Sequence, residues 1–103
     1  MFRIGFSEDI HKKEAGRKLF LAGIEFPGEI GLKGHSDADV VCHAVAESIL
    51  GALALGDLGS YFPDNDPQYK GISSLILLDK VVDLMMKDGF RFQLVQLHCK
   101  NML

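Results

Sequence analysis

Two short segments of the sequence carry side chains that could bind a metal ion. Asp9 and His11 are separated by one residue, and His43 ends the stretch GHSDADVVCH at residues 34–43. If the chain is extended around Asp9, both side chains of the Asp-x-His pair point to the same side. Two imidazoles and a carboxylate form a ligand set of the kind found in catalytic zinc sites, where a fourth position stays open. The pattern is compatible with such a site, although an Asp-x-His pair and a helical histidine also occur by chance.

The stretch at residues 34–43 also has the composition of a helix N-terminus. Ser36 or Asp37 can cap a helix, and acidic side chains are favourable charges in its first turn. Asp39 lies four residues before His43, on the same face of such a helix. We therefore expect Asp39 to orient the His43 imidazole from outside the ligand set, or to act as a ligand itself. The alternative is a purely structural role for the whole stretch.

Two further segments could bind a phosphorylated or hydroxylated ligand. Residues 34–36 precede the expected helix, where free backbone N–H groups favour a phosphate or a developing oxyanion. The glycines of GDLG at 56–59 allow the backbone to approach a ligand closely. Three aspartates nearby could accept hydrogen bonds from sugar-like hydroxyls: Asp57, Asp64 and Asp66. The sequence PDNDP is also typical of turns, and the residues alone favour the turns.

The hydrophobic pattern predicts the elements that would position these residues. Along the chain they are a strand at 2–4, a hairpin from 18–21 and 24–26, a helix from 36 or 37 to about 55, a long loop at 56–71, a helix from 73 or 74 to near 88, and a strand at 90–99. We expect one α+β domain over residues 1–103, with a mixed sheet and helices packed on one of its faces. The second helix is apolar on more than one face, and the last strand has an uncovered edge. These features predict a domain that is incomplete at its C-terminus or is one subunit of an oligomer.

Composition argues against several classes of protein. A chain of 103 residues with 48% hydrophobic residues is long enough for one core. A net charge of −3 argues against nucleic-acid binding, and no apolar run approaches the ~18 residues of a membrane span. Because the N-terminus has no secretory signal, we expect a cytoplasmic protein, or one in an organelle matrix after removal of a presequence. Cys42 and Cys99 are then expected to be buried, free thiols.

Three motifs together resemble a known enzyme family. They are D-I-H at 9–11, H-S-D-x-D-x-x-x-H at 35–43, and A-L-G-D-x-G-x-x-F-P-D-x-D-P-x-[FY]-K-G at 54–71. Over residues 2 to about 90 the chain resembles the 2-C-methyl-D-erythritol 2,4-cyclodiphosphate synthases. The two longer motifs are ordered and specific, so a chance match is not a serious competitor.

The resemblance implies a zinc-dependent phosphorus–oxygen lyase of the non-mevalonate route to isoprenoids. Its substrate would be 4-diphosphocytidyl-2-C-methyl-D-erythritol 2-phosphate. The 2-phosphate attacks the β-phosphorus, CMP leaves, and the 2,4-cyclodiphosphate closes. The family also implies a homotrimer with active sites between subunits. It further implies a second ion, Mg²⁺ or Mn²⁺, whose protein ligand is not found in this chain.

The resemblance also assigns roles to particular residues. The metal ligands would be Asp9, His11 and His43, for Zn²⁺ or another divalent transition metal, and His35 would stabilise the transition state. The residues implied to contact the substrate are Asp9, His11, His35, Ser36, Asp57, Leu58, Gly59, Phe62, Pro63, Asp64, Asn65 and Asp66. The cytidine pocket is assigned to no residue of this chain.

The chain departs from the family pattern in two ways. Ser7 and Glu8 stand where a glycine and an aromatic residue are common, and Glu8 adds a carboxylate beside the expected zinc pair. Family chains also continue beyond the position of Leu103, through a cytidine-binding segment and a Thr-Thr-Glu loop. We therefore expect a truncated domain of the synthase type. The alternative is a non-catalytic, zinc-binding member of the family.

Overall fold

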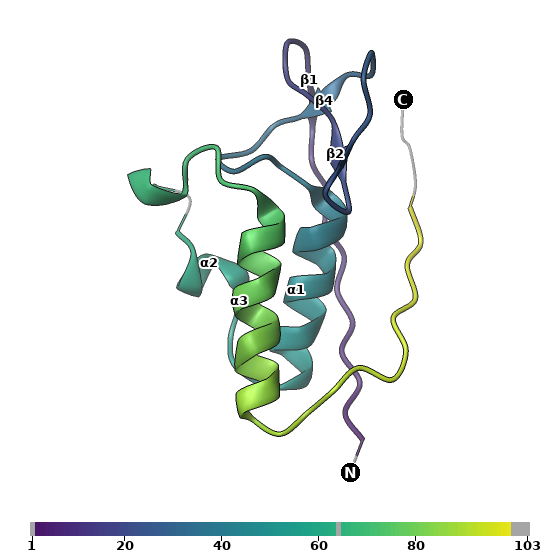
Figure 1. Cartoon of the computed structure of the whole chain (residues 1–103), viewed down its shortest axis with the longest axis vertical. Coiled ribbons are helices and arrows are strands. Elements are labelled where there is room, and N and C mark those ends of the chain that lie inside the picture. Colours follow the sequence, from purple (N-terminus) through teal and green to yellow (C-terminus); the bar gives the residue numbers. More distant parts are fainter. Residues whose placement is uncertain (1, 64, 100–103) are drawn as a thin grey trace.

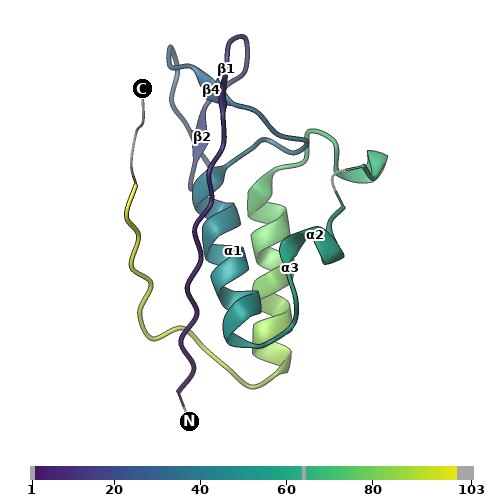
Figure 2. The same cartoon turned by 180° about the vertical axis from the view of Figure 1, so that it is seen from behind.

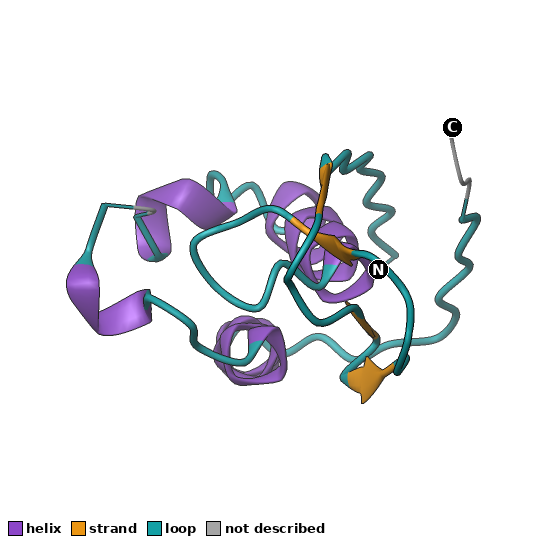
Figure 3. Cartoon of the chain, turned by 90° about the horizontal axis from the view of Figure 1, so that it is seen from above, coloured by secondary structure: helices purple, strands orange, loops and turns teal. Residues whose placement is uncertain are grey.

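Two long helices form the centre of the structure, a computed structural model that describes residues 2–63 and 65–99. Helix α1 spans Val40–Ala52 and helix α3 spans Ser74–Lys87. They lie side by side, and both begin at the end of the molecule that carries the strands (Figure 1). Viewed along their axes, the two helices are seen end-on next to each other (Figure 3). Their N-termini therefore face the same region of the molecule.

The core lies between α1 and α3. Apolar side chains at helical spacing on each helix meet there, and Phe62 closes one side. The buried residues of this cluster are Ala46, Ile49, Leu50, Leu53, Phe62, Leu77, Val81 and Met85. Cys42 is also buried, as expected, whereas Cys99 is exposed, which corrects the expectation that both thiols are buried. No helix in the described part is both long enough and apolar enough to cross a bilayer.

The strands form two small antiparallel sheets. Strand β1 (Lys13–Glu14) pairs with β4 (Gly31–Leu32), and β2 (Phe20–Leu21) pairs with β3 (Ile24–Glu25). The second pair confirms the predicted hairpin. The α+β character is therefore correct, but the described residues form no single mixed sheet, and the long helices pack against each other.

Helix α1 begins later and ends earlier than predicted. Its N-cap is Asp39, whose carboxylate accepts a hydrogen bond from the Cys42 backbone N–H at 3.1 Å. At the other end, Ala54 adopts a left-handed conformation with φ 55°, so the helix ends at Ala52, before the predicted glycine stop. Helix α3 matches its prediction, with Ser73 as its N-cap.

Residues 2–10 and 90–99 are extended but form no strand in the described part of the chain. Alternating side chains correctly predicted extended backbone, but a strand also needs a neighbour with which to exchange backbone hydrogen bonds. The N-terminal segment instead runs along α1 (Figure 2). The Ser7 hydroxyl donates to the Ala44 carbonyl at 2.5 Å, and a Cβ on Gly5 would clash with the Ser48 carbonyl oxygen. This close approach places Asp9 and His11 beside the first turns of α1.

Two short helices shape the connection between α1 and α3. Helix α2 (Leu58–Tyr61) is capped by Asp57, and the 3-10 helix η1 (Pro67–Tyr69) is capped by Asp66. The predicted long loop therefore contains two helical turns. Their capping aspartates fit the turn chemistry expected from the sequence.

Candidate metal centre and adjoining pocket

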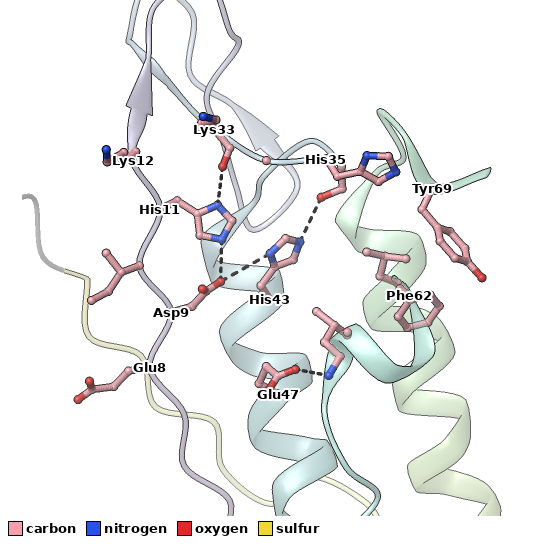
Figure 4. Close-up of a pocket in the computed structure, with 16 residues that line it drawn as sticks. Glu8, Asp9, His11, Lys12, Lys33, His35, His43, Glu47, Phe62 and Tyr69 are labelled. Atoms are coloured by element: carbon pink, nitrogen blue, oxygen red, sulfur yellow. Dashed lines mark hydrogen bonds and ion pairs between the residues drawn. The ribbon is translucent and has the colours of Figure 1, made fainter. Parts of the chain in front are cut away.

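The three predicted metal ligands converge in the structure. Asp9 and His11 come from the N-terminal segment and His43 comes from α1 (Figure 4). One ligand atom from each residue can be chosen so that all three lie within 4.8 Å of one another. Asp9 Oδ2 is 2.9 Å from His11 Nε2 and 3.6 Å from His43 Nδ1. Two imidazole nitrogens thus surround a single carboxylate oxygen.

The hydrogen bond at the far side of His11 determines what its ring presents to Asp9. His11 Nδ1 lies 3.1 Å from the Lys33 carbonyl oxygen, which can only accept, so Nδ1 carries the proton in the neutral ring. The lone pair of Nε2 is then directed at the Asp9 carboxylate. Such an arrangement requires a positive charge between the two groups, either a proton or a metal ion. The donor set fits Zn²⁺ or another divalent transition metal.

Asp9 is held in its ionised form. Partial burial works against ionisation, but the neighbouring His11 and His43 rings outweigh it and bring the pKa of Asp9 well below its ordinary value. The carboxylate is therefore charged at neutral pH, as a metal ligand must be.

Asp39 does not have the role that was expected for it. Its fully buried carboxylate accepts hydrogen bonds from the backbone N–H groups of Ala22, Gly23 and Cys42, at 2.9, 2.6 and 3.1 Å. These bonds fasten the β2–β3 turn to the start of α1. Asp39 therefore organises backbone, and the expectation that it orients the His43 ring is corrected.

Hydroxyl groups take the place expected for Asp39 beside His43. The Nε2 atom of the ring lies 2.9 Å from Ser74 Oγ and 3.3 Å from Ser36 Oγ. Ser74 is the first residue of α3, so this contact joins the two long helices. Asp37 in turn accepts from the hydroxyl and the backbone N–H of Ser74.

A cavity of about 490 Å³ adjoins the three candidate ligands. The predicted site residues that line it are Asp9, His11, His35, Ser36, His43, Leu58, Gly59 and Phe62. Asp57, Pro63, Asn65 and Asp66 do not line it, and Asp64 lies outside the described residues. Glu8, the departure from the family pattern, is exposed and does line the cavity.

His35 connects two sides of the cavity. Its Nε2 atom lies 2.8 Å from the Asp66 carbonyl oxygen, and its own carbonyl accepts from the Gly71 backbone N–H at 2.8 Å. The residues on either side of it are held by Arg17, whose guanidinium donates to the carbonyls of Gly34 and Ser36. Hydrogen bonds therefore hold the ring of His35, its own backbone and the backbone on either side of it.

Several residues of the site were not predicted from the sequence. Arg17 and Ser74 contact it only because distant segments meet, so no local pattern could reveal them. Glu47 lies four residues after His43, on the same helical face, and accepts from the Leu58 backbone N–H. Lys12 and Lys33 also line the cavity.

Comparisons with known proteins show which proteins this chain resembles. Residues 2–100 match the model of the YgbB family. Over 88 residues the chain is 61% identical to 2-C-methyl-D-erythritol 2,4-cyclodiphosphate synthase of Brachyspira hyodysenteriae and 56% identical to that of Geobacter sulfurreducens. Each alignment covers 85% of this chain and 56% of the relative, so the chain spans little more than half the length of these relatives. A solved structure of a 2C-methyl-D-erythritol-2,4-cyclodiphosphate synthase in a CDP-bound form matches with a TM-score of 0.77 and 41% identity, covering 84% of this chain and 58% of that one.

Proposed function

The chain belongs to the YgbB family, and we propose that its cavity serves the reaction for which its relatives are named. This is the conversion of 4-diphosphocytidyl-2-C-methyl-D-erythritol 2-phosphate into 2-C-methyl-D-erythritol 2,4-cyclodiphosphate and CMP. One observation carries the proposal. Asp9, His11 and His43 converge at the edge of a cavity that His35 and Ser36 also line.

We propose that Asp9, His11 and His43 hold Zn²⁺, with Mg²⁺ or Mn²⁺ as a second ion. A bound divalent ion would neutralise phosphate charge and polarise a phosphoryl oxygen. The requirement for positive charge beside Asp9 supports this assignment. The chain as a whole carries a net charge of −3, so charge complementary to phosphates has to be local.

The reaction is an internal transfer that needs no added water. An oxygen of the 2-phosphate bonds to the β-phosphorus, and the bond from that phosphorus to the bridging oxygen breaks. The bridging oxygen leaves with CMP. The chain contributes by positioning these groups and neutralising their charge. We assign this work to His35 and Ser36, with Lys12 and Lys33 adding positive charge at the cavity wall.

The opposite wall suits the methylerythritol part of the substrate. Leu58, Gly59 and Phe62 line it and present apolar surface and open backbone. Glu47 fixes this wall by accepting from the Leu58 backbone N–H. Asp57 and Asp66 cap the short helices that form the wall, and we propose that they act on the substrate through the shape of this loop.

We also propose that the domain assembles as a homotrimer with active sites between subunits. This proposal is supported by exposed apolar side chains on the N-terminal segment, which another subunit could cover. They are Phe2, Ile4, Phe6 and Ile10, each more than four-fifths exposed. Side chains of this kind are stabilised when another surface removes them from water.

The purified chain should release CMP and form the cyclic product when incubated with zinc, magnesium and the diphosphocytidyl substrate. Phosphorus NMR distinguishes both products from the substrate. The variant His98→Ala should behave like the wild type in this assay, because His98 is exposed and does not line the cavity. If the chain binds zinc but releases no CMP, the non-catalytic, zinc-binding alternative is the correct one.

A further inference from the structure

A chain of hydrogen bonds runs from Asp37 through Ser74 to the His43 ring. Ser74 is fully buried. Its hydroxyl donates to Asp37 Oδ1, and its Oγ lies 2.9 Å from His43 Nε2. Asp37 Oδ2 also accepts from the Ser74 backbone N–H at 3.1 Å, so the carboxylate holds this serine by two atoms.

The direction of each hydrogen bond follows from the chemistry of the partners. An ionised carboxylate can only accept, so the single hydroxyl proton of Ser74 points to Asp37. The oxygen of Ser74 then faces His43 with its lone pairs and must accept from Nε2–H. In the neutral imidazole the other nitrogen, Nδ1, therefore keeps its lone pair. That nitrogen lies 3.6 Å from Asp9 Oδ2.

We propose that Ser74, held by Asp37, is a positioning residue that fixes His43 as the Nε2–H tautomer and presents Nδ1 to the metal ion. The inference rests on the metal site of the proposed function. It assigns to a serine on α3 the orienting role that the sequence suggested for Asp39. Outer hydrogen-bond partners of metal-binding histidines commonly set both the tautomer and the ring orientation.

Ser74 could instead simply stabilise the start of α3. The neighbouring serine provides a control for that role. The neighbouring Ser73 caps this helix by accepting from the Leu75 backbone N–H at 3.3 Å. Ser73→Ala thus removes a helix cap without removing the hydroxyl beside His43. Ser74→Thr keeps that hydroxyl, and Ser74→Ala removes it.

The tautomer can be measured directly in the metal-free protein. Long-range proton–nitrogen NMR at mildly alkaline pH distinguishes the protonated from the unprotonated ring nitrogen, and His43→Gln identifies the His43 signals. We expect Nε2–H in the wild type, Ser73→Ala and Ser74→Thr, and a mixture of tautomers in Ser74→Ala. A wild-type His43 with its proton on Nδ1 would overturn the proposal without reference to any variant.

Zinc titration provides the second readout. We expect Ser74→Ala to weaken zinc binding by about 10–100-fold, while Ser73→Ala and Ser74→Thr stay close to the wild type. An equal loss in Ser73→Ala, or unchanged affinity in a folded Ser74→Ala, would overturn the proposal. If the wild type binds no zinc, the proposed metal site fails, whereas the metal-free tautomer still tests the Ser74 contact separately.

Discussion

At the scale of single residues, the site is organised around Asp9 Oδ2. Burial and the two histidines act on this carboxylate in opposite directions, and the histidines prevail. The candidate ligand triad was predictable from the resemblance to the synthase family, because an Asp-x-His pair and a helical histidine alone also occur by chance. The partners of its rings were not, since the Lys33 carbonyl and the Ser74 hydroxyl reach the rings only in the folded chain. The role expected for Asp39 was wrong. Its spacing to His43 is helical, but its carboxylate accepts hydrogen bonds from backbone N–H groups.

The two cysteines should differ sharply in reactivity. Burial, together with the Asp39 carboxylate, raises the pKa of the Cys42 thiol to about 12, whereas Cys99 is exposed. With a chromogenic disulfide reagent at pH 8, we expect one thiol to react rapidly in the native protein and the second only after unfolding. Cys99→Ser should remove the rapid phase. A rapid phase that persists in this variant would show that Cys42 is accessible.

At the scale of elements, the segment between β4 and α1 joins the parts of the site. Asp39 binds the β2–β3 turn, Arg17 binds the carbonyls of Gly34 and Ser36, and His35 reaches the loop before α3. The sequence predicted the β2–β3 hairpin and α3 because their signals are local turn residues and caps. It could not predict whether extended segments find a partner strand, and the strands expected at 2–4 and 90–99 are absent from the described residues.

Replacing Asp39 should destabilise the fold while leaving the metal ligands in place. Asp39→Ala removes a fully buried carboxylate that accepts from three backbone N–H groups, and we expect a loss of about 3 kcal/mol or more in the free energy of unfolding. Urea denaturation measures this loss. Asp83→Ala, at an exposed position of α3, is the matched control and should be nearly neutral. A stability equal to that of the control would contradict the role given to Asp39.

Arg17 should matter for catalysis more than for metal binding. Lysine cannot reproduce the planar fork that donates to two carbonyls, so Arg17→Lys should loosen the loop that carries His35 and Ser36. We expect roughly tenfold slower CMP release with zinc still bound, equivalent to about 1.4 kcal/mol. The exposed Arg91→Lys serves as control. Wild-type rates in Arg17→Lys would show that the loop does not depend on this clamp.

At the scale of the whole molecule, the three candidate ligands come from two different parts of the chain. Asp9 and His11 belong to a largely exposed N-terminal segment, and the partly buried His43 belongs to the helix pair. The hydrophobic pattern could predict the helix pair, because its apolar faces repeat at helical spacing. The course of the N-terminal segment along α1 depends on packing at Gly5 and on the Ser7 hydrogen bond, neither of which has a sequence signature.

Zinc should therefore stabilise the folded chain. At a free zinc concentration one hundred times the dissociation constant, binding to the folded state alone adds about 2.7 kcal/mol. We expect a clear rise in the melting temperature on adding zinc and its reversal by a chelator, followed by calorimetry. His11→Ala should show neither change. A melting temperature that does not respond to zinc in the wild type would contradict a metal site that joins these segments.

Zinc stoichiometry tests the central claim, that Asp9, His11 and His43 form one metal site, most directly. Metal analysis of the purified protein should find one zinc per chain in the wild type and in His98→Ala, and none in His43→Ala. Circular dichroism of His43→Ala would verify that the helices remain folded. Stoichiometric zinc retained by a folded His43→Ala, or a wild type that binds no zinc, would contradict the assignment.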